Sequence, residues 1–365
     1  MKFPFRPQLT TQVKSYASNT PKLTPSMLDC TMGVNPYGHP EEAARALREF
    51  DLTHLSSYPH SEVLNEAIVN YWADFAAVKS AEVTTVNGSV CGLYYVNSVF
   101  AMAEKNEVVA CAPAFTDMVE NVKNYGMVYR GVPLCFDGDG HVDMDGLIAA
   151  IGDKTAMVYV DRPHNPTGQT VSLADMRRLL DAAKKKGAYV MADEAYGDFI
   201  PREESCLTLW DEYSNLIVVR TFSKGFGLAN LRCGYVIAPE NISKMLAKML
   251  NPYMLSDMHR AVCAAALTRP DHPMAHAADF AAVKQTIRSK IGKKLMMLTT
   301  DDRVPIFTLA LKGEGDLQAM LLKENVLAIS GVEFECMDER YVRMCVVSNE
   351  RAQRMIDAIS RVEQA

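Results

Sequence analysis

Charged side chains of different chemical types follow short apolar runs in the middle of the sequence. Asp193 directly follows the run Tyr189–Ala192, and Lys224 follows the run Leu216–Val219 among hydroxyl and glycine residues. Arg232 comes eight residues after Lys224. A lysine amine can form a Schiff base with a carbonyl group, an acid can hold the proton of a pyridinium ring, and an arginine beside hydroxyls suits a phosphate ester. These residue types can therefore act together on one cofactor.

Two turns supply the polar groups that such a site still needs. The turn Asn87–Ser89 follows the run 84–86 and precedes a helical pattern, an order that leaves backbone amides free at the start of a helix. After the run 156–160 come Asp161 and the polar segment 162–168. Ligands of open α/β sheets bind just beyond the carboxyl ends of the strands. The combined set of groups predicts a cradle for pyridoxal 5′-phosphate.

The elements that must position these groups define the fold class. Short apolar runs alternate with helical patterns, which indicates an α/β fold with a mostly parallel sheet covered by helices on both faces. The predicted strands are 84–86, 107–111, 156–160, 189–192, 216–219 and 234–237, and the predicted helices around them are 41–48, 61–78, 116–125, 142–151 and 172–186.

The pattern changes near residue 240, where longer helices precede a few strands. This predicts a large cofactor-binding domain at 45–250 and a smaller α+β domain made of 1–44, a turn-rich N-terminal arm, together with 251–365. The predicted elements of this second part are helices 241–250, 254–267, 274–299 and 315–324, strands 304–310, 326–329 and 341–347, and a terminal helix from Asn349.

Composition excludes several classes of protein. The 365 residues are 48% hydrophobic and 22% charged, which is typical of a globular protein with room for a full enzyme core. The net charge of −6 without dense like-charge blocks argues against a nucleic-acid binder. Nine scattered cysteines without zinc spacing indicate reduced thiols and no metal site, and no export signal or apolar membrane span is found, so we expect a cytoplasmic protein.

Three ordered motifs make the sequence recognisable. Asn165-Pro166-x-Gly168, Asp193-x-x-Tyr196 and Ser223-Lys224 with Arg232 resemble the fold-type-I pyridoxal-phosphate enzymes of the class I/II aminotransferase family. The spacing along residues 165–232 also fits, and the resemblance extends over nearly the whole chain. It implies a large domain with a mostly parallel seven-stranded sheet, a smaller α+β domain, and pyridoxal 5′-phosphate as cofactor.

The resemblance assigns roles to individual residues. Lys224 is the implied Schiff-base lysine and the base that moves a proton, while Asp193 pairs with the pyridine nitrogen. Tyr196 and Asn165 are implied to hydrogen-bond the phenolic oxygen of the cofactor. The remaining implied cofactor contacts are an aromatic ring stacked on the pyridine, Phe115, and a phosphate cup formed by Gly88, Ser89, Val90, Thr221, Ser223 and Arg232.

Further matches concern assembly and substrate. Tyr58, in Ser57-Tyr58-Pro59, resembles the family tyrosine that reaches the phosphate of the neighbouring subunit, which implies a homodimer with shared active sites. Arg343 stands where the family binds the substrate α-carboxylate, with Asn165 beside it and Gly33 in the N-terminal segment that closes over the substrate. The implied substrates are small molecules, an amino acid and a keto acid.

Within the family, the sequence is most similar to the branch of histidinol-phosphate aminotransferases and threonine-phosphate decarboxylases. The resemblance lies in Asn35-Pro36-x-Gly38, Pro252-Tyr253 and the segment 338–343. That branch usually has an arginine after the Gly331-Val332 step to meet a substrate phosphate, and this chain has acids there instead. Glu335 is either an acid facing the distal end of the substrate or a solvated strand residue, and His164 is either a substrate contact or a packed loop residue.

The leading functional hypothesis is an aminotransferase that moves the amino group of an L-amino acid to a 2-keto acid through the Schiff base on Lys224. The same cradle also supports α-decarboxylation, or another lyase or cyclase reaction at the α-carbon. A non-catalytic, ligand-sensing binder with an aminotransferase-like fold is the alternative from another class. The sequence alone does not identify the amino acid or the reaction branch.

Overall fold

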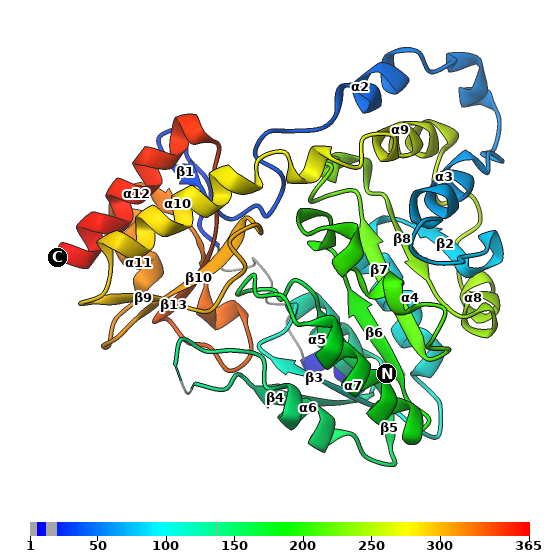
Figure 1. Cartoon of the computed structure of the whole chain (residues 1–365), viewed down its shortest axis with the longest axis horizontal. Helices are drawn as coiled ribbons and strands as arrows, with labels where there is room; N and C mark the ends of the chain where they lie inside the picture. Colours follow the sequence, from blue (N-terminus) through cyan, green and yellow to red (C-terminus); the bar gives the residue numbers. More distant parts are fainter. Residues whose placement is uncertain (1–5, 12–19, 137) are drawn as a thin grey trace, which may run out of the picture.

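The core of the fold is a seven-stranded sheet with the order β2-β8-β7-β6-β5-β3-β4 (Figure 1). The computed structural model describes residues 6–11, 20–136 and 138–365. Strands β3 to β7 pair in parallel, and β8 runs antiparallel to both of its neighbours. The prediction of a mostly parallel α/β sheet is confirmed. The strands are β2 (Val83–Val86), β3 (Glu107–Ala112), β4 (Val128–Pro133), β5 (Thr155–Asp161), β6 (Tyr189–Asp193), β7 (Leu216–Thr221) and β8 (Gly234–Ile237).

The reversed direction of β8 brings three loops to one edge of the sheet. The first residue of β8, Gly234, pairs with Thr221 at the end of β7 and with Val86 at the end of β2. The segment that precedes β8 therefore lies at the same edge as the segments that follow β7 and β2. This register places Arg232 beside Ser223.

Alternate residues of the central strands face opposite helical layers. Val158 and Val160 of β5 lie in one apolar core, and Met157 and Tyr159 lie in the other. Because both faces are buried, these strands are apolar throughout. One face is covered by α4 (Gly88–Phe100), α5 (Thr116–Asn124) and α8 (Glu240–Ala247), and the other by α3 (Val63–Trp72), α6 (Met144–Ala150), α7 (Leu173–Lys185) and α9 (Asp257–Leu267).

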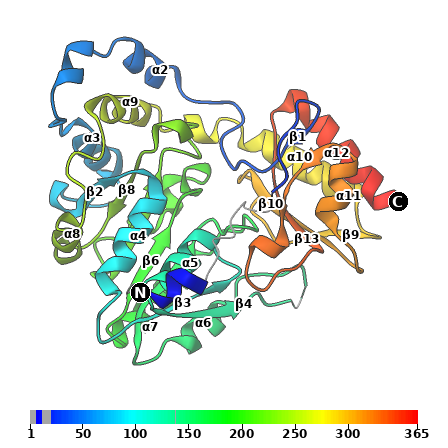
Figure 2. The same cartoon turned by 180° about the vertical axis from the view of Figure 1, so that it is seen from behind.

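A smaller α+β part lies beside the sheet and has its own apolar core (Figures 1 and 2). An N-terminal segment, β1 (Leu28–Asp29), pairs with β11 (Val326–Leu327) in this part. Residues 255–267 contribute instead to a core against the large sheet, so the domain boundary at 250 stays a prediction. The other elements of the smaller part are α10 (Ala277–Lys290), α11 (Leu317–Lys323), α12 (Asn349–Gln364), β9 (Leu295–Met297), β10 (Ile306–Leu311), β12 (Ile329–Ser330) and β13 (Tyr341–Cys345).

The structure corrects two of the predicted helices and adds a strand that was not predicted. The helix predicted at 274–299 is wrong, because α10 ends at Lys290 and the chain turns at Gly292, whose φ of 149° is outside the helical region, before entering β9. The helix predicted at 61–78 stops at Trp72. Strand β4 was not predicted, since it is an edge strand with mostly exposed side chains and lacks an apolar run.

Three further predictions concern an export signal, the state of the cysteines and membrane-spanning helices. Residues 1–5 and 12–19, which belong to the predicted N-terminal arm and to the segment searched for an export signal, lie outside the described residues. All nine cysteines are free thiols in the structure. Among the described helices, none combines the length and the apolar character that a membrane crossing requires.

The terminal helix holds the edge of the small sheet through one carboxylate. Glu363 of α12 accepts hydrogen bonds from the backbone N–H groups of residues 292–295 at 2.5 to 3.1 Å. Partial burial opposes ionisation of Glu363, but these donors outweigh it and lower the pKa of the carboxyl. The interaction fixes the entry to β9, which pairs with β10 and so supports the sheet that carries β13.

Replacing Glu363 with Gln should therefore destabilise the fold. We expect a loss of about 2 kcal/mol in the free energy of unfolding at pH 7, because hydrogen bonds to a charged acceptor are lost. The pKa of Glu363 is lower in the folded protein than in the unfolded chain. Its contribution to the free energy of unfolding is therefore fully present above the unfolded pKa and is lost as the pH falls through the folded pKa. Urea unfolding at pH 7 and pH 4 measures this, with the exposed Glu314→Gln as control. Equal losses at both pH values would contradict the assignment.

Candidate active site

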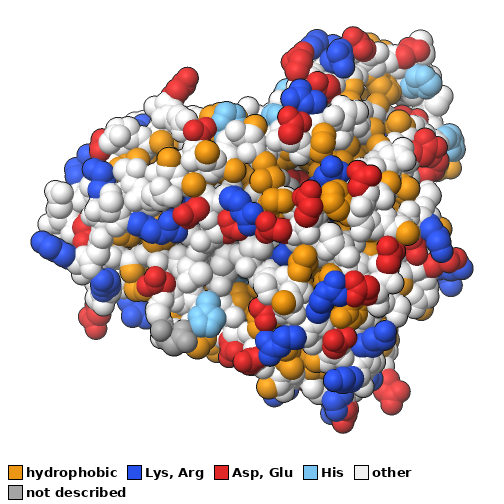
Figure 3. All heavy atoms as spheres, in the orientation of Figure 1, with side chains coloured by type: hydrophobic (Ala, Val, Ile, Leu, Met, Phe, Trp, Pro, Cys, Tyr) orange, Lys and Arg blue, Asp and Glu red, His pale blue; other side chains and the backbone are white. Residues whose placement is uncertain are grey.

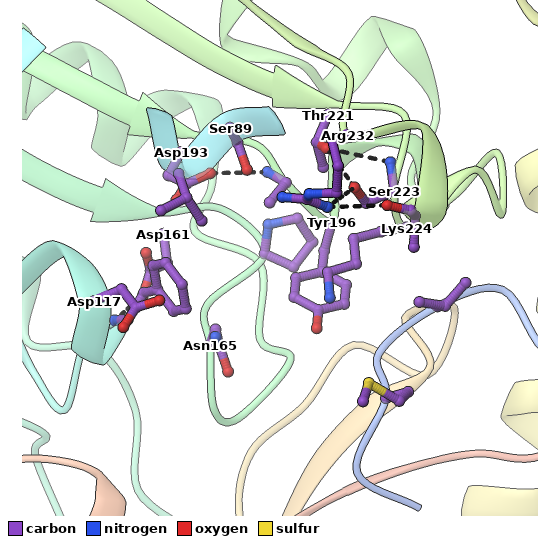
Figure 4. Close-up of a pocket in the computed structure, with 17 residues that line it drawn as sticks. Ser89, Asp117, Asp161, Asn165, Asp193, Tyr196, Thr221, Ser223, Lys224 and Arg232 are labelled. Carbon is purple, nitrogen blue, oxygen red and sulfur yellow. Dashed lines mark hydrogen bonds between the residues drawn. The ribbon is translucent and has the colours of Figure 1, made fainter. Parts of the chain in front are cut away.

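A cavity of about 250 Å³ opens at the carboxyl edge of the large sheet (Figure 4). Its wall combines an amine, carboxyl groups, hydroxyls and a guanidinium from strands far apart in the sequence. Ten of the predicted site residues line this cavity: Ser89, Val90, Phe115, Asn165, Asp193, Tyr196, Thr221, Ser223, Lys224 and Arg232. The lining residues without a predicted role are Met32, Val34, Asp117, Asp161, Pro163, Ala195 and Ala229.

One end of the cavity is built from donors that suit an anion. Thr221 Oγ1 lies 3.0 Å from Ser223 Oγ, and Arg232 Nη1 donates to Ser223 Oγ at 3.4 Å. Ser89 lies in the first turn of α4, whose N-terminus carries partial positive charge. Gly88 has φ of 76°, and a Cβ there would lie 2.7 Å from Arg232 Nη2, so only glycine lets the guanidinium approach this turn.

Lys224 and Tyr196 meet in the middle of the cavity (Figure 4). The Lys224 ammonium lies 5.5 Å from the centroid of the Tyr196 ring. The backbone of Lys224 accepts a hydrogen bond from Asn35 N at 2.9 Å, which ties the lysine to the N-terminal segment. Gly33 of that segment packs so closely on the tyrosine that a Cβ would lie 1.9 Å from the Tyr196 hydroxyl. Gly33 therefore adjoins the cavity through Tyr196.

Asp193 is a buried carboxyl held by two donors. Its Oδ1 accepts from Ala195 N at 3.0 Å, and its Oδ2 accepts from the Tyr159 hydroxyl at 2.8 Å. Burial raises the pKa of Asp193, while the hydrogen bonds from Tyr159 and Ala195 and the positive charge of Lys224 oppose the rise. Tyr159 received no role from the sequence, because inside an apolar strand it has the pattern of a core residue.

A buried charge cluster supports the loop that follows Asp193. The Arg220 guanidinium pairs with both Glu194 and Asp198, and it lies 4.7 Å from the centroid of the Trp72 ring. Glu194 also accepts hydrogen bonds from the Ser205 hydroxyl and the Cys206 N–H, both at 2.6 Å. Since charged groups buried this deeply need paired partners, the cluster fixes the path of residues 193–198. That path carries Tyr196 into the cavity.

Arg343 lies next to Asn165 and is almost fully buried. It comes from β13 of the small sheet, and its Nη1 donates to Asn165 Oδ1 at 3.4 Å. Its Nη2 donates to the backbone oxygen of Thr31. Arg343, the residue predicted to bind the substrate α-carboxylate, thus reaches the loop that borders the cavity, although it belongs to the smaller part of the structure.

The structure resolves the two alternatives for His164 in favour of a packed loop residue. Its Nε2 donates to Pro113 O at 2.8 Å, and its Nδ1 lies 2.7 Å from Thr167 Oγ1. Burial lowers the pKa of His164 to about 4, so the imidazole is neutral at pH 7. His164 therefore joins the loop before Phe115 to the loop after Asn165.

Glu335 and Tyr58 lie outside the cavity lining. Glu335 is exposed and lies 3.7 Å from the Lys123 ammonium, which fits the alternative of a solvated acid. Tyr58 is 72% exposed, and its ring stacks on that of Tyr253 with centroids 4.7 Å apart. The structure thus does not bring Tyr58 to the site of its own chain.

One lining residue carried the same sequence signal as Asp193 but was given no role. Asp161 is the last residue of β5, as Asp193 is of β6, and both side chains are buried. A carboxyl at the end of an apolar strand is a signal for a site residue in either case. The family motif begins later in the loop, so the resemblance gave Asp161 no role.

The fold and this site define a class of protein, and comparison with known sequences identifies the family. The family described as "Aminotransferase class I and II" matches residues 25–359, and the chain belongs to it. A histidinol-phosphate aminotransferase of Salmonella schwarzengrund is 34% identical over 221 residues, and one of Salmonella typhimurium is 34% identical over 220 residues. Each match covers 60% of this chain and 60% of the relative, so only about 60% of the length of these relatives is spanned.

Solved structures show the same fold at lower sequence identity. The histidinol-phosphate aminotransferase from Clostridium acetobutylicum superposes with a TM-score of 0.81 at 21% identity, covering 93% of this chain and 99% of that one. Aspartate aminotransferase from Thermus thermophilus with maleate gives 0.83 at 17% identity, covering 99% and 100%. The Sinorhizobium meliloti histidinol-phosphate aminotransferase in complex with pyridoxal-5′-phosphate gives 0.80 at 18% identity, covering 99% and 97%. These likenesses confirm the fold class.

Acid sensitivity provides a test of the packed state of His164. The native pKa is about 4 and the ordinary value is 6.5, so its contribution to stability is present above pH 6.5 and is lost as the pH falls to about 4. This loss amounts to about 3 kcal/mol. We expect His164→Gln to remove that part of the acid dependence in urea unfolding between pH 7.5 and 4. Substitution of the exposed His54 with Gln should leave the slope unchanged, and an unchanged slope in His164→Gln would contradict the packed, neutral state.

Proposed function

We propose that this protein is a pyridoxal 5′-phosphate-dependent aminotransferase acting on an L-amino acid and a 2-keto acid. One observation carries the proposal: Lys224, Asp193 and the donors around Arg232 line the same cavity at the edge of the sheet. An amine, a buried acid and an anion-binding end are the groups that this cofactor needs. The membership of the chain in the aminotransferase family supports the same assignment.

The residues present fit the cofactor. The Lys224 amine would bond covalently to its aldehyde carbon, and Asp193 would hold the proton of its ring nitrogen. The approach of Arg232 to Gly88, possible only without a side chain at Gly88, creates an end suited to a phosphate. The other proposed contacts are the phosphate with Ser89, Val90, Thr221 and Ser223, the phenolic oxygen with Asn165 and Tyr196, and the ring face with Phe115.

Bound pyridoxal phosphate supplies a carbonyl carbon that condenses with amines and a protonated ring that accepts electrons released at the substrate α-carbon. Lys224 would carry the proton away from that carbon and deliver it elsewhere on the cofactor, which requires an amine free to move within the cavity. Asp193, held by Tyr159 and Ala195, would keep the ring nitrogen protonated. Arg343, with Asn165 and Gly33 nearby, would orient the substrate through its α-carboxylate.

We propose a substrate without a phosphate group. The step Gly331-Val332 is followed by Glu333 and Glu335 rather than by a basic residue. Glu333 is 2% exposed, and its backbone oxygen accepts from the Thr116 hydroxyl at 2.6 Å, which places this turn against the start of α5. This turn therefore lacks the arginine that would meet a substrate phosphate.

We also propose a cytoplasmic homodimer with shared active sites. A patch of exposed apolar side chains lies on the segments before α3 and after α8, and Figure 3 shows apolar side chains at the surface where α2 (Glu41–Arg48), α3 and α9 lie. Apolar patches of this kind favour protein association. Tyr58 lies in this patch rather than in the cavity of its own chain, which suits a contact with the partner's site. The other members of the patch are Leu52, Leu55, Val63 and Tyr253.

Replacing Lys224 with Ala tests the proposed function directly. We expect borohydride reduction to fix the cofactor covalently to the unaltered protein but not to Lys224→Ala, because only an imine to a protein amine is reduced to a stable covalent link; the mass of the reduced, denatured protein measures this. Amino-group transfer should fall by about 10³-fold or more, because the nucleophile and the proton carrier are lost together. Lys184→Ala, on the outer face of α7, is the matched control. Covalent fixation of the cofactor to Lys224→Ala at the level of the unaltered protein would contradict the proposal.

The reaction branch is tested with the unaltered protein and a panel of amino acids, without a keto acid. An aminotransferase should accumulate pyridoxamine phosphate and release one keto acid for each cofactor. Release of CO₂ without pyridoxamine phosphate would instead identify an α-decarboxylase. Absence of any change with every amino acid would favour a non-catalytic binder.

Mixing two inactive variants tests the shared sites. Tyr58→Ala lacks the residue supplied to the partner, and Lys224→Ala lacks the covalent anchor. A mixed dimer has one site with both defects and one site with neither, so co-refolded or co-expressed variants should recover activity that neither shows alone. Recovery in the mixture measures the effect, and each variant taken alone through the same procedure is the control. No recovery despite mixed dimers would contradict the sharing of sites.

A further inference from the structure

Two buried carboxyl groups lie side by side at the edge of the sheet. Asp161 and Asp193 are direct partners in the register of β5 and β6, and both line the cavity. They are 4% and 5% exposed. Partnered residues on neighbouring parallel strands send their side chains to the same face, with the strands about 4.8 Å apart. The two carboxyls therefore share one poorly solvated environment.

The hydroxyl of Tyr159 connects the two carboxyls. Tyr159 is fully buried, donates to Asp193 Oδ2 at 2.8 Å, and also interacts with Asp161. A tyrosine hydroxyl has one proton to donate, and its oxygen accepts. Because that proton goes to Asp193, Asp161 forms a favourable contact with the same hydroxyl when it donates a proton of its own. An ionised Asp161 would face the hydroxyl oxygen lone pair against lone pair.

The charges around the pair favour one ionised carboxyl, at Asp193. Two anions this close and this buried repel each other strongly, so one proton is retained. The positive charge of Lys224 acts on Asp193, whereas Glu194 raises the pKa of Asp193 by repulsion.

The surroundings of Asp161 keep its proton in place. Burial and the charge of Asp193 raise the pKa of Asp161 well above its ordinary value, against the contact with the Tyr159 hydroxyl and hydrogen bonds from the backbone of Phe115 and Asn165. The Cys111 thiol of β3 packs in the core on the other face of the sheet, and burial raises the pKa of this thiol, so it adds no charge near Asp161.

We propose that Asp161 is a positioning residue that remains a neutral carboxylic acid, donates its proton to the Tyr159 hydroxyl oxygen, and so directs the Tyr159 proton to Asp193. This inference rests on the proposed function, because it takes Asp193 as the anion that pairs with the ring nitrogen of the cofactor. A neutral donor at 161 orders the hydroxyl without adding a second negative charge beside Asp193. Asp161 therefore controls how firmly Asp193 holds the ring-nitrogen proton.

The first test measures the protonation state of Asp161 without using catalysis. Above about pH 3.9 an unfolded aspartate loses its proton, whereas the native Asp161 keeps it, so the original protein loses stability as the pH rises. In Asp161→Asn the uncharged amide can still donate a hydrogen bond, but it has no proton that titrates in this pH range. Its thermal unfolding midpoint should therefore rise relative to the original protein between pH 5 and pH 8, with and without added pyridoxal phosphate. Glu335→Gln, which removes an exposed carboxylate outside the cavity, should show no such trend. A midpoint lowered equally at every pH would overturn the inference.

The second test follows the visible spectrum of the bound cofactor against pH. Asp161→Asn should titrate as the original protein does, and Asp161→Ala should shift the titration, because only alanine removes the donor. In a Tyr159→Phe background the effect of Asp161→Ala should disappear, since the hydroxyl that links it to Asp193 is gone. A shifted titration in Asp161→Asn, or an undiminished alanine effect without the hydroxyl, would overturn the inference. A protein with no cofactor band would instead overturn the proposed function, while the midpoint test would still report on Asp161.

Discussion

Burial of the Asp193 carboxyl at the end of a sheet strand is the constraint on which the rest of the site depends. A carboxylate removed from water is unstable unless donors replace the lost solvation, and here Tyr159 and Ala195 provide them. The next turn of chain is held by Arg220, which satisfies Glu194 on one side and Asp198 on the other. Together these interactions leave residues 193–198 a single path. That path aims one carboxyl and one tyrosine into the same cavity.

The direction of β8 is the second condition for the site. Were β8 parallel to β7, its first residue would lie at the opposite edge of the sheet, far from the loop after β7. Because it is antiparallel, the residues before it meet those after β7 and after β2. Arg232 can then bond Ser223 while passing the Gly88 turn. A single reversed strand in an otherwise parallel arrangement thus gathers cationic and hydroxyl groups at one end of the cavity.

The sequence was sufficient for the fold class and for the residues at strand ends, because apolar runs and the polar groups that follow them are local patterns. It failed where tertiary context decides. Strand β4 is exposed at the edge and has no apolar run, and the helix predicted through 299 gives way to β9, which is defined by pairing with β10. Tyr159 has the pattern of a core residue, yet its hydroxyl supports Asp193. Likewise, only the structure shows that His164 is enclosed between two loops and that Glu335 points to solvent beside Lys123.

Arg343 has a consequence for motion. It belongs to the small sheet, donates to Asn165 in a loop of the large sheet, and donates to Thr31 just before the segment that reaches Lys224 through Asn35. Arg343 thus connects its own strand by hydrogen bonds to two other stretches of polypeptide. A ligand that takes the Nη2 donor of Arg343 from Thr31 would break the bond between the small sheet and the N-terminal segment. Breaking that bond would free Arg343 and the N-terminal segment from each other at the same time.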